Sequence, residues 1–377
     1  MGTRLVFLDN LRVFLTMLVV AHHAAQPYGP TGGAWPIFNP ERAAILGAFF
    51  AVNAAFFMGL FFFISGYLLP AAYARKGAQQ FLRSRFRRLG IPLLGLSIVV
   101  FPLVLYSVHG ASESFVEFIL QTYIQPLSLE VAHLWFLVHL LVYAVCYTLW
   151  QQMNRTDELT RATPEDQGSV PGHRTILIYL LVLSTVTFIV RIVYPIDRWV
   201  QLFGLIPAEI AHLPQYVSLF VLGIVAYQYN WLRRMGTLQG LTWLGIGLAA
   251  AGLRYGYSIG RARYGLADVI EGGGWDWRSA LWSGWEATIC VGLCIGLVTL
   301  FRKKNDFQSK ILRILSDNAY MVYLIHLLPI LYLQFMIDSI SISPLAKFGI
   351  VTLVGLPLCF GCSMLLRRVP FVKWVVL

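Results

Sequence analysis

Residues 43–69 read AAILGAFFAVNAAFFMGLFFFISGYLL, an apolar run without a charged side chain. A helix needs about 20 such residues to cross the roughly 30 Å of hydrocarbon in a bilayer. Within lipid, the backbone N–H and C=O groups must bond inside their own segment, which a helix achieves. The run therefore predicts a membrane-spanning helix.

The composition extends this interpretation to the whole chain of 377 residues. Hydrophobic residues make up 58% of it and charged residues only 12%, with a mean hydropathy of +0.67. Soluble domains carry roughly 45–50% apolar and about 25% charged residues, so lipid must cover much of this surface. We expect an all-α, polytopic bundle of about ten transmembrane helices. The expected spans are 7–25, 43–69, 91–109, 131–151, 175–195, 212–229, 238–257, 279–301, 317–336 and 346–366.

The basic residues set the expected orientation. Most of the 29 Lys and Arg residues fall in alternate loops between the apolar runs, and Lys and Arg are enriched in cytosolic loops. This pattern places both termini in the cytosol. Because topology explains the net charge of +11, we expect membrane lipid and no nucleic acid as a partner. We treat 1–377 as one membrane-embedded domain without a soluble accessory domain.

The cysteines give no sign of a metal site. All five lie inside apolar spans, where cysteine usually behaves as a small buried hydrophobe. Cys359 and Cys362 have the C-x-x-C spacing but no nearby His or acidic residue. We expect no metal and no structural disulfide.

The first span carries two polar residues, Arg12 and His23, on one helical face. Their separation in sequence corresponds to three turns plus about 20°, and to roughly 16 Å along the axis. Arg at the centre of a membrane costs about 2.5–3.5 kcal/mol, and such residues usually face a cavity or a partner. Asp9 is the expected ion-pair partner of Arg12. The alternative is that Arg12 and His23 extend to the two membrane interfaces.

A basic segment, Arg83-Ser-Arg-Phe-Arg-Arg-Leu-Gly-Ile-Pro92, holds more arginine than orientation requires. Arg85 and Arg88 are three apart, so on a helix they project together. The planar guanidinium suits bidentate contacts with phosphate. The pair predicts a site for an anionic headgroup or a nucleotide at the cytosolic mouth. Ordinary positive-inside charge with lipid binding is the alternative.

Taken together, these features resemble acyltransferase family 3, a family of membrane O-acyltransferases. The markers follow the family's order along nearly the whole chain: Leu8-Asp9-x-Leu11-Arg12 with His23 as an Arg-x10-His pattern, the Phe-Phe-x-Ile-Ser-Gly-Tyr stretch ending at Tyr67, Arg85-x-x-Arg88, His133-Leu-Trp-Phe-Leu137, and Ala319-Tyr320-x-x-Tyr323-Leu-Ile-His326. Several of these, with Val369-Pro-Phe-Val-Lys-Trp374, look similar to the branch that succinylates periplasmic glucans.

The resemblance implies a reaction across the membrane. An acetyl or succinyl group would pass from a cytosolic acyl-CoA to a hydroxyl of an extracytoplasmic carbohydrate, such as a periplasmic glucan or surface polysaccharide. Arg85 and Arg88 would bind the CoA phosphates, and Arg12 would line the passage for the pantetheine arm. His23 would act as general base or as an acyl relay. The acyl-CoA is a co-substrate, no cofactor is bound permanently, and the location is the bacterial cytoplasmic (inner) membrane.

Four further side chains are candidates for the site. Glu286 is the deepest carboxylate, and such a residue is a functional candidate by default. It would orient a histidine as a catalytic residue, or pair with an arginine such as Arg254. His133, Trp135 and His326 are candidates for the substrate pocket. The alternatives are a rim histidine bonded to a carbonyl for His133, packing for Trp135, and helix–helix bonding for His326.

A multispan transporter or flippase of a glycan or lipid-linked substrate is the rival class. Such a protein also has buried Arg and His and basic inner loops. Transporters commonly contain internal repeats and interrupted helices near the midplane. The sequence contains no repeat at a fixed period, which favours the enzyme.

Overall fold

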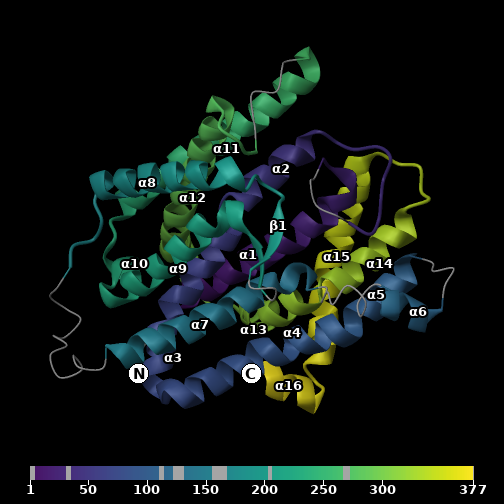
Figure 1. Ribbon diagram of the computed structural model, residues 1–377, viewed down its shortest axis with the longest axis horizontal. Helices are drawn as coiled ribbons and strands as arrows, with labels where there is room; N and C mark the ends of the chain where they lie inside the picture. Colours follow the sequence, from purple (N-terminus) through teal and green to yellow (C-terminus); the bar gives the residue numbers. More distant parts are fainter. Residues whose placement is uncertain are drawn as a thin grey trace.

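The computed structural model describes residues 5–30, 35–109, 114–121, 131–154, 168–202, 206–265 and 272–376. Helices pack side by side into one bundle, with α1 running through its middle (Figure 1). The helices are α1 (Val6–Ala25), α2 (Ile45–Ala54), α3 (Phe57–Arg85), α4 (Ile91–Gly95), α5 (Phe101–His109), α6 (Phe115–Ile119), α7 (Trp135–Met153), α8 (His173–Val193), α9 (Leu213–Gln228), α10 (Trp231–Arg234), α11 (Thr237–Tyr264), α12 (Trp277–Lys304), α13 (Lys310–Ile325), α14 (Leu327–Ile337), α15 (Pro344–Leu366) and α16 (Pro370–Val376).

One small sheet departs from the expected all-α fold. Strands β1 (Trp199–Leu202) and β2 (Ile206–Glu209) pair antiparallel, with Trp199 opposite Glu209. The strands lie between α8 and α9, within a stretch that we expected to be a loop between the spans 175–195 and 212–229. They are too short to alternate clearly in hydrophobicity, which is the signal that identifies a strand in sequence.

Each expected span coincides with helix, but the boundaries differ. Seven helical segments of the described chain are long and apolar enough to cross a membrane, and eight if the pair α13 and α14, bent by 65°, counts as one span. The expected spans 43–69 and 91–109 lie in one helical run, Ile45–Ser107. The expected span 238–257 lies within α11, which is not among the seven.

The run 43–69 is interrupted where α2 gives way to α3. The side-chain amide of Gln215 on α9 donates to the Ala55 carbonyl at 2.9 Å, which satisfies a backbone group freed by the break. Further along, α3 contains Gly77 with φ +68°, a conformation that glycine adopts at little cost. The chain changes direction there, and the arginine-rich segment follows.

Close helix contacts depend on glycine at two positions. A Cβ on Gly66 of α3 would lie 2.1 Å from the Phe220 carbonyl oxygen, and one on Gly223 of α9 would lie 2.2 Å from the Phe63 carbonyl oxygen. Without side chains at these points, the backbones of α3 and α9 approach each other directly. Small residues allow this approach in membranes, where packing rather than hydrophobic burial holds helices together.

The N-terminal part of α1 is fixed by polar contacts to the connection between α12 and α13. The Asn10 amide donates to the carbonyls of Asn305 at 2.7 Å and Phe307 at 3.0 Å. Leu11 and Leu15 on α1 are fully buried. The helix that carries Arg12 and His23 is therefore held in place along its length.

Candidate active site

Three predicted site residues, His23, His133 and His326, lie together within the bundle. They come from α1, from the 3-10 turn Ala132–Leu134 and from the break between α13 and α14. The ring centroids are 4.9 Å apart for His23 and His326, 4.5 Å for His133 and His326, and 6.2 Å for His23 and His133. We call these three residues the histidine cluster.

His326 is fully buried at the helix break. Its Nδ1 lies 2.8 Å from the Tyr323 carbonyl oxygen, and its Nε2 lies 3.1 Å from Nδ1 of His23. A buried imidazole without such partners would be costly. Because His23 is 303 positions away in the chain, the sequence could not reveal this partner.

His133 is held at two points by α13. Its Nε2 lies 3.2 Å from the Leu324 carbonyl oxygen, and its own carbonyl accepts a hydrogen bond from the Tyr323 hydroxyl. The preceding residue, Ala132, has φ +41°, a left-handed conformation that costs roughly 1–2 kcal/mol for a residue with a Cβ. The structure therefore maintains a strained backbone next to the cluster.

Trp35 and Gln334 border the cluster. The Trp35 ring stacks on His23, with centroids 5.7 Å apart, and its indole nitrogen donates to Oε1 of Gln334 at 2.9 Å. The Gln334 amide donates in turn to the carbonyls of His23 and Ala24. We did not identify either residue from sequence. The sequence did offer one signal for this contact, the amide of Gln334 in the otherwise apolar stretch that forms α14. The side chain is fully buried in the structure.

The predicted arginines gather around Tyr320 on α13. The Tyr320 hydroxyl donates to the Arg88 carbonyl, and the Arg88 guanidinium lies over the Tyr320 ring, 5.1 Å from its centroid. Arg12 and Arg85 also lie close enough to act on Tyr320 electrostatically. Arg12 pairs with Asp9 at 3.7 Å, which confirms the expected ion pair. We call Arg12, Arg85, Arg88 and Tyr320 the arginine cluster.

Helix α13 connects the arginine cluster with the histidine cluster. Tyr320 belongs to the first, Tyr323 bonds to the backbone of His133, and His326 bonds to His23. The distance along the helix axis from position 320 to position 326 is about 9 Å at 1.5 Å per residue. Helix α1 connects the same two clusters through Arg12 and His23. Helices α1 and α13 thus each carry residues of both clusters.

Glu286 on α12 belongs to a different group of side chains. Its two carboxylate oxygens accept from Nη2 of Arg191 on α8 at 2.9 and 2.8 Å, and the Trp282 indole donates to one of them. Glu286 therefore pairs with an arginine, as the alternative proposed, but the partner is Arg191 and not Arg254, which lies over the Trp282 ring. Within the described residues, Glu286 makes no hydrogen bond to the histidine cluster, and its catalytic role stays a prediction.

Glu286 does orient a histidine, but it is His212, to which we assigned no role from sequence. The two ring nitrogens of His212 lie 3.0 Å from Glu286 and 2.9 Å from Glu209 at the end of β2. Nε2 faces the Glu286 carboxylate, while Nδ1 lies within ion-pair distance of Glu209 without the alignment of a hydrogen bond. A protonated His212 would, together with Arg191, balance the charges of the two acids. We call Arg191, Glu209, His212 and Glu286 the ion network.

Aromatic rings lie between the ion network and the histidine cluster. Trp135, two residues after His133, stacks on Tyr216 with centroids 5.4 Å apart, and Tyr216 stacks on His212. His139 on α7 bonds to the Pro207 carbonyl of β2 at 3.0 Å. The β-hairpin is therefore held next to Trp135, whose place in a substrate pocket stays a prediction.

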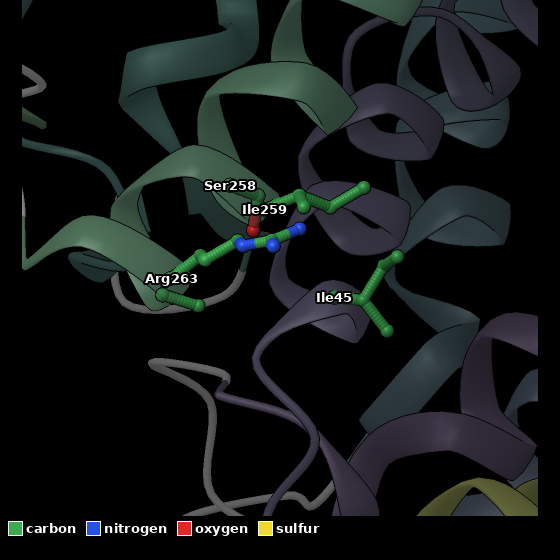
Figure 2. A pocket seen from close by; sticks show the side chains of 5 residues that line it. Ile45, Ser258, Ile259 and Arg263 are labelled. Carbon is green, nitrogen blue, oxygen red and sulfur yellow. The ribbon is translucent and has the colours of Figure 1, made fainter.

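A separate cavity of about 320 Å³ lies where α11 meets α2. Figure 2 shows Ser258, Ile259 and Arg263 of α11 facing Ile45 of α2. The residues that line it belong to none of the three groups defined above. The last turns of α11 extend beyond the neighbouring helices (Figure 1).

The chain is similar to known proteins along most of its length. A family model described as "Acyltransferase domain" matches residues 5–364. Glucans biosynthesis protein C of Escherichia coli strain K12 is 25% identical over 329 residues, which cover 85% of this chain and 80% of that protein. The proteins of the same name from strains 536 and SMS-3-5 match equally. No solved structure matches this fold.

Proposed function

Because the chain belongs to the acyltransferase family that the model describes, we propose that it moves an acyl group from cytosolic acyl-CoA to a hydroxyl of an extracytoplasmic glycan. The protein is a membrane O-acyltransferase. The name of its E. coli relatives supports a glucan as acceptor. The proposed location is the bacterial inner membrane, because acyl-CoA lies on one side of it and the glycan on the other.

The arginine cluster supports the donor side of the proposal. Arg85 and Arg88 lie at the end of the bundle that the distribution of Lys and Arg assigns to the cytosol. Guanidinium groups bind phosphate oxygens through strong charge-assisted hydrogen bonds. We assign Arg85 and Arg88 to the CoA phosphates. We assign Arg12, which belongs to the same cluster, to the start of the path for the pantetheine arm.

The histidine cluster supports the chemical step. His23 takes the proton of the acceptor hydroxyl while the hydroxyl oxygen attacks the thioester carbonyl. An ester bond forms and the carbon–sulfur bond breaks, and the departing thiolate takes the proton from His23. An imidazole suits this exchange because its ordinary pKa of about 6.5 is near neutrality. A general base contributes about 10²–10⁴-fold to the rate.

One observation carries the proposal. Helices α1 and α13 each present a residue to the arginine cluster and a histidine to the histidine cluster, and the two histidines are bonded to each other. An acyl-CoA bound by the arginine cluster would therefore extend its acyl group toward the imidazoles of the histidine cluster. The transporter hypothesis is supported only by the break between α13 and α14. The match to an acyltransferase family argues against it.

The experiment is mass spectrometry of surface and periplasmic glycans from cells with and without the protein. Cells with it are expected to contain an added acyl mass, which distinguishes acetyl from succinyl. His23→Ala abolishes that mass, while His173→Ala, a histidine that stacks on Trp243 away from the cluster, retains it. Equal acylation in His23→Ala and the parent, at equal membrane levels, contradicts the proposal.

A further inference from the structure

We propose that His326 is a positioning residue, which holds His23 in the tautomer with a proton on Nδ1 and a lone pair on Nε2. The inference rests on the proposed function, since it explains how His23 serves as the base. It goes beyond that function in assigning a role to a residue in another helix. The contacts that carry it are two carbonyl oxygens and one bond between imidazoles.

The first step concerns His23. Its Nδ1 lies 3.0 Å from the Val19 carbonyl oxygen, one turn earlier on α1. A carbonyl oxygen only accepts, so Nδ1 carries the hydrogen. A neutral imidazole has one N–H and one lone pair. The lone pair of His23 is therefore on Nε2.

The second step reaches the same tautomer from α13. Nδ1 of His326 lies 2.8 Å from the Tyr323 carbonyl oxygen, so this nitrogen also donates. Its Nε2, 3.1 Å from Nδ1 of His23, then accepts the hydrogen that His23 directs toward both Val19 and His326. If His326 carried a proton on Nε2, two N–H groups would face each other. The two carbonyls together allow only one arrangement.

The arrangement suits proton transfer. When Nε2 of His23 takes the hydroxyl proton, the ring becomes a cation whose other N–H is already bonded to Val19 and His326. That bond becomes charge-assisted. Charge-assisted hydrogen bonds are shorter than neutral ones and about twice as strong. The ring need not turn during the reaction. A third group that orients the base is the general logic of hydrolase triads, where a carboxylate usually serves.

A neutral imidazole replaces the carboxylate for a physical reason. His326 is fully buried, and an unpaired carboxylate at that place would cost several kcal/mol in desolvation. The helix break also gives His326 its position. The helix axis bends by 65° between α13 and α14, and His326 lies at this bend, at the end of α13. The ring there reaches α1 while it remains bonded to its own helix.

The test compares two substitutions that differ in one property. His326→Gln keeps an oxygen that accepts from His23 and an N–H that donates to Tyr323, whereas His326→Leu has neither. We expect His326→Leu to lower kcat by about 100-fold or more with an unchanged KM for acyl-CoA. His326→Gln is expected to recover kcat to within about tenfold of the parent. Equal kcat in the two variants overturns the proposal.

A spectroscopic measurement on the parent protein tests the tautomer of His23 even if the His326 variants do not fold. ¹⁵N-histidine spectra of the parent in lipid nanodiscs, compared with those of His23→Gln, identify the signals of His23. We expect a protonated Nδ1 and an unprotonated Nε2, and the reverse assignment overturns the proposal. The proposed function fails separately, through retained activity in His23→Ala. Loss of activity in His23→Ala with full activity in His326→Leu rejects only the role of His326.

Discussion

Tyr320 and Arg88 hold each other in two ways. The Tyr320 hydroxyl bonds to the backbone of Arg88, and the guanidinium of Arg88 lies 5.1 Å from the centre of the Tyr320 ring. The contact joins α13 to the π-helical turn Phe86–Gly90 that follows α3. It therefore fixes the position of a predicted phosphate ligand relative to the helix that bears His326.

Removal of the Tyr320 ring is expected to weaken donor binding. A cation–π contact contributes about 0.5–2 kcal/mol, so Tyr320→Ala is expected to raise KM for acyl-CoA by a few-fold to about 30-fold. Tyr320→Phe keeps the ring and loses only the hydroxyl, so its KM is expected to rise less. Steady-state kinetics in detergent provide the comparison. A larger effect in Tyr320→Phe than in Tyr320→Ala would show that the ring contact is unimportant.

Arg88 and Arg87 form a matched pair for the phosphate assignment. Arg88 lies over Tyr320, while the Arg87 guanidinium lies over Trp374 of α16 at 5.2 Å. A hydrogen bond to a charged group contributes about 1.5–3 kcal/mol. Arg88→Ala is accordingly expected to weaken acyl-CoA binding by about 10- to 100-fold, and Arg87→Ala by much less. Titration of the purified variants with acyl-CoA measures both, and equal affinity in the two variants would return Arg88 to a lipid contact.

The ion network predicts a stability effect at Glu286. Its pair with Arg191 is buried, and removal of one partner from a buried pair costs about 3–5 kcal/mol. Glu286→Gln is expected to lower the thermal unfolding temperature, and Arg191→Met with Glu286→Leu together to lower it less. Unchanged activity per molecule of folded Glu286→Gln protein would limit Glu286 to this structural role. Loss of that activity without a change in unfolding would support the catalytic role instead.

The β-hairpin is expected to stay anchored at neutral and mildly acidic pH. Burial raises the pKa of the Glu209 carboxyl, but the charge of the adjacent His212 outweighs burial and leaves the pKa below its ordinary value of 4.5. Since a lowered pKa stabilises the folded state above the ordinary value, the anchor is lost only as the pH falls below 4.5.

Hydrogen exchange of the backbone amides in residues 199–202 and 206–209 measures this anchor. After correction for intrinsic rates, the parent is expected to show equal protection at pH 7 and pH 5. Glu209→Gln is expected to exchange faster at both, while the exposed Glu41→Gln matches the parent. Loss of protection in the parent between pH 7 and pH 5 would contradict the role of Glu209.

Local periodicity explains what the sequence could predict. The placement of Arg12 and His23 on one face of a helix follows from their spacing alone, as does the common direction of Arg85 and Arg88. Long apolar runs predict helices because lipid leaves few other options. These arguments need only residues that are near one another in the chain.

The remaining features depend on contacts between distant residues. His23 with His326, and Gln334 with the His23 carbonyl, join the two ends of the chain. For His212, only Glu209 is near in sequence, three residues earlier, whereas Glu286 lies on α12 and joins it only in the fold. The break at His326 did have a local signal, because Pro329 cannot donate to the Ile325 carbonyl, but the expected span 317–336 ran through it.

Inside-out membrane vesicles with glycan enclosed test the central claim most directly, because acyl-CoA added outside then meets only the cytosolic face. The account predicts that the parent acylates the enclosed glycan and that His23→Ala, at equal abundance, does not. Acylation by His23→Ala at the parental rate, or acylation only when acyl-CoA is enclosed with the glycan, would contradict a donor path from the arginine cluster to the histidine cluster.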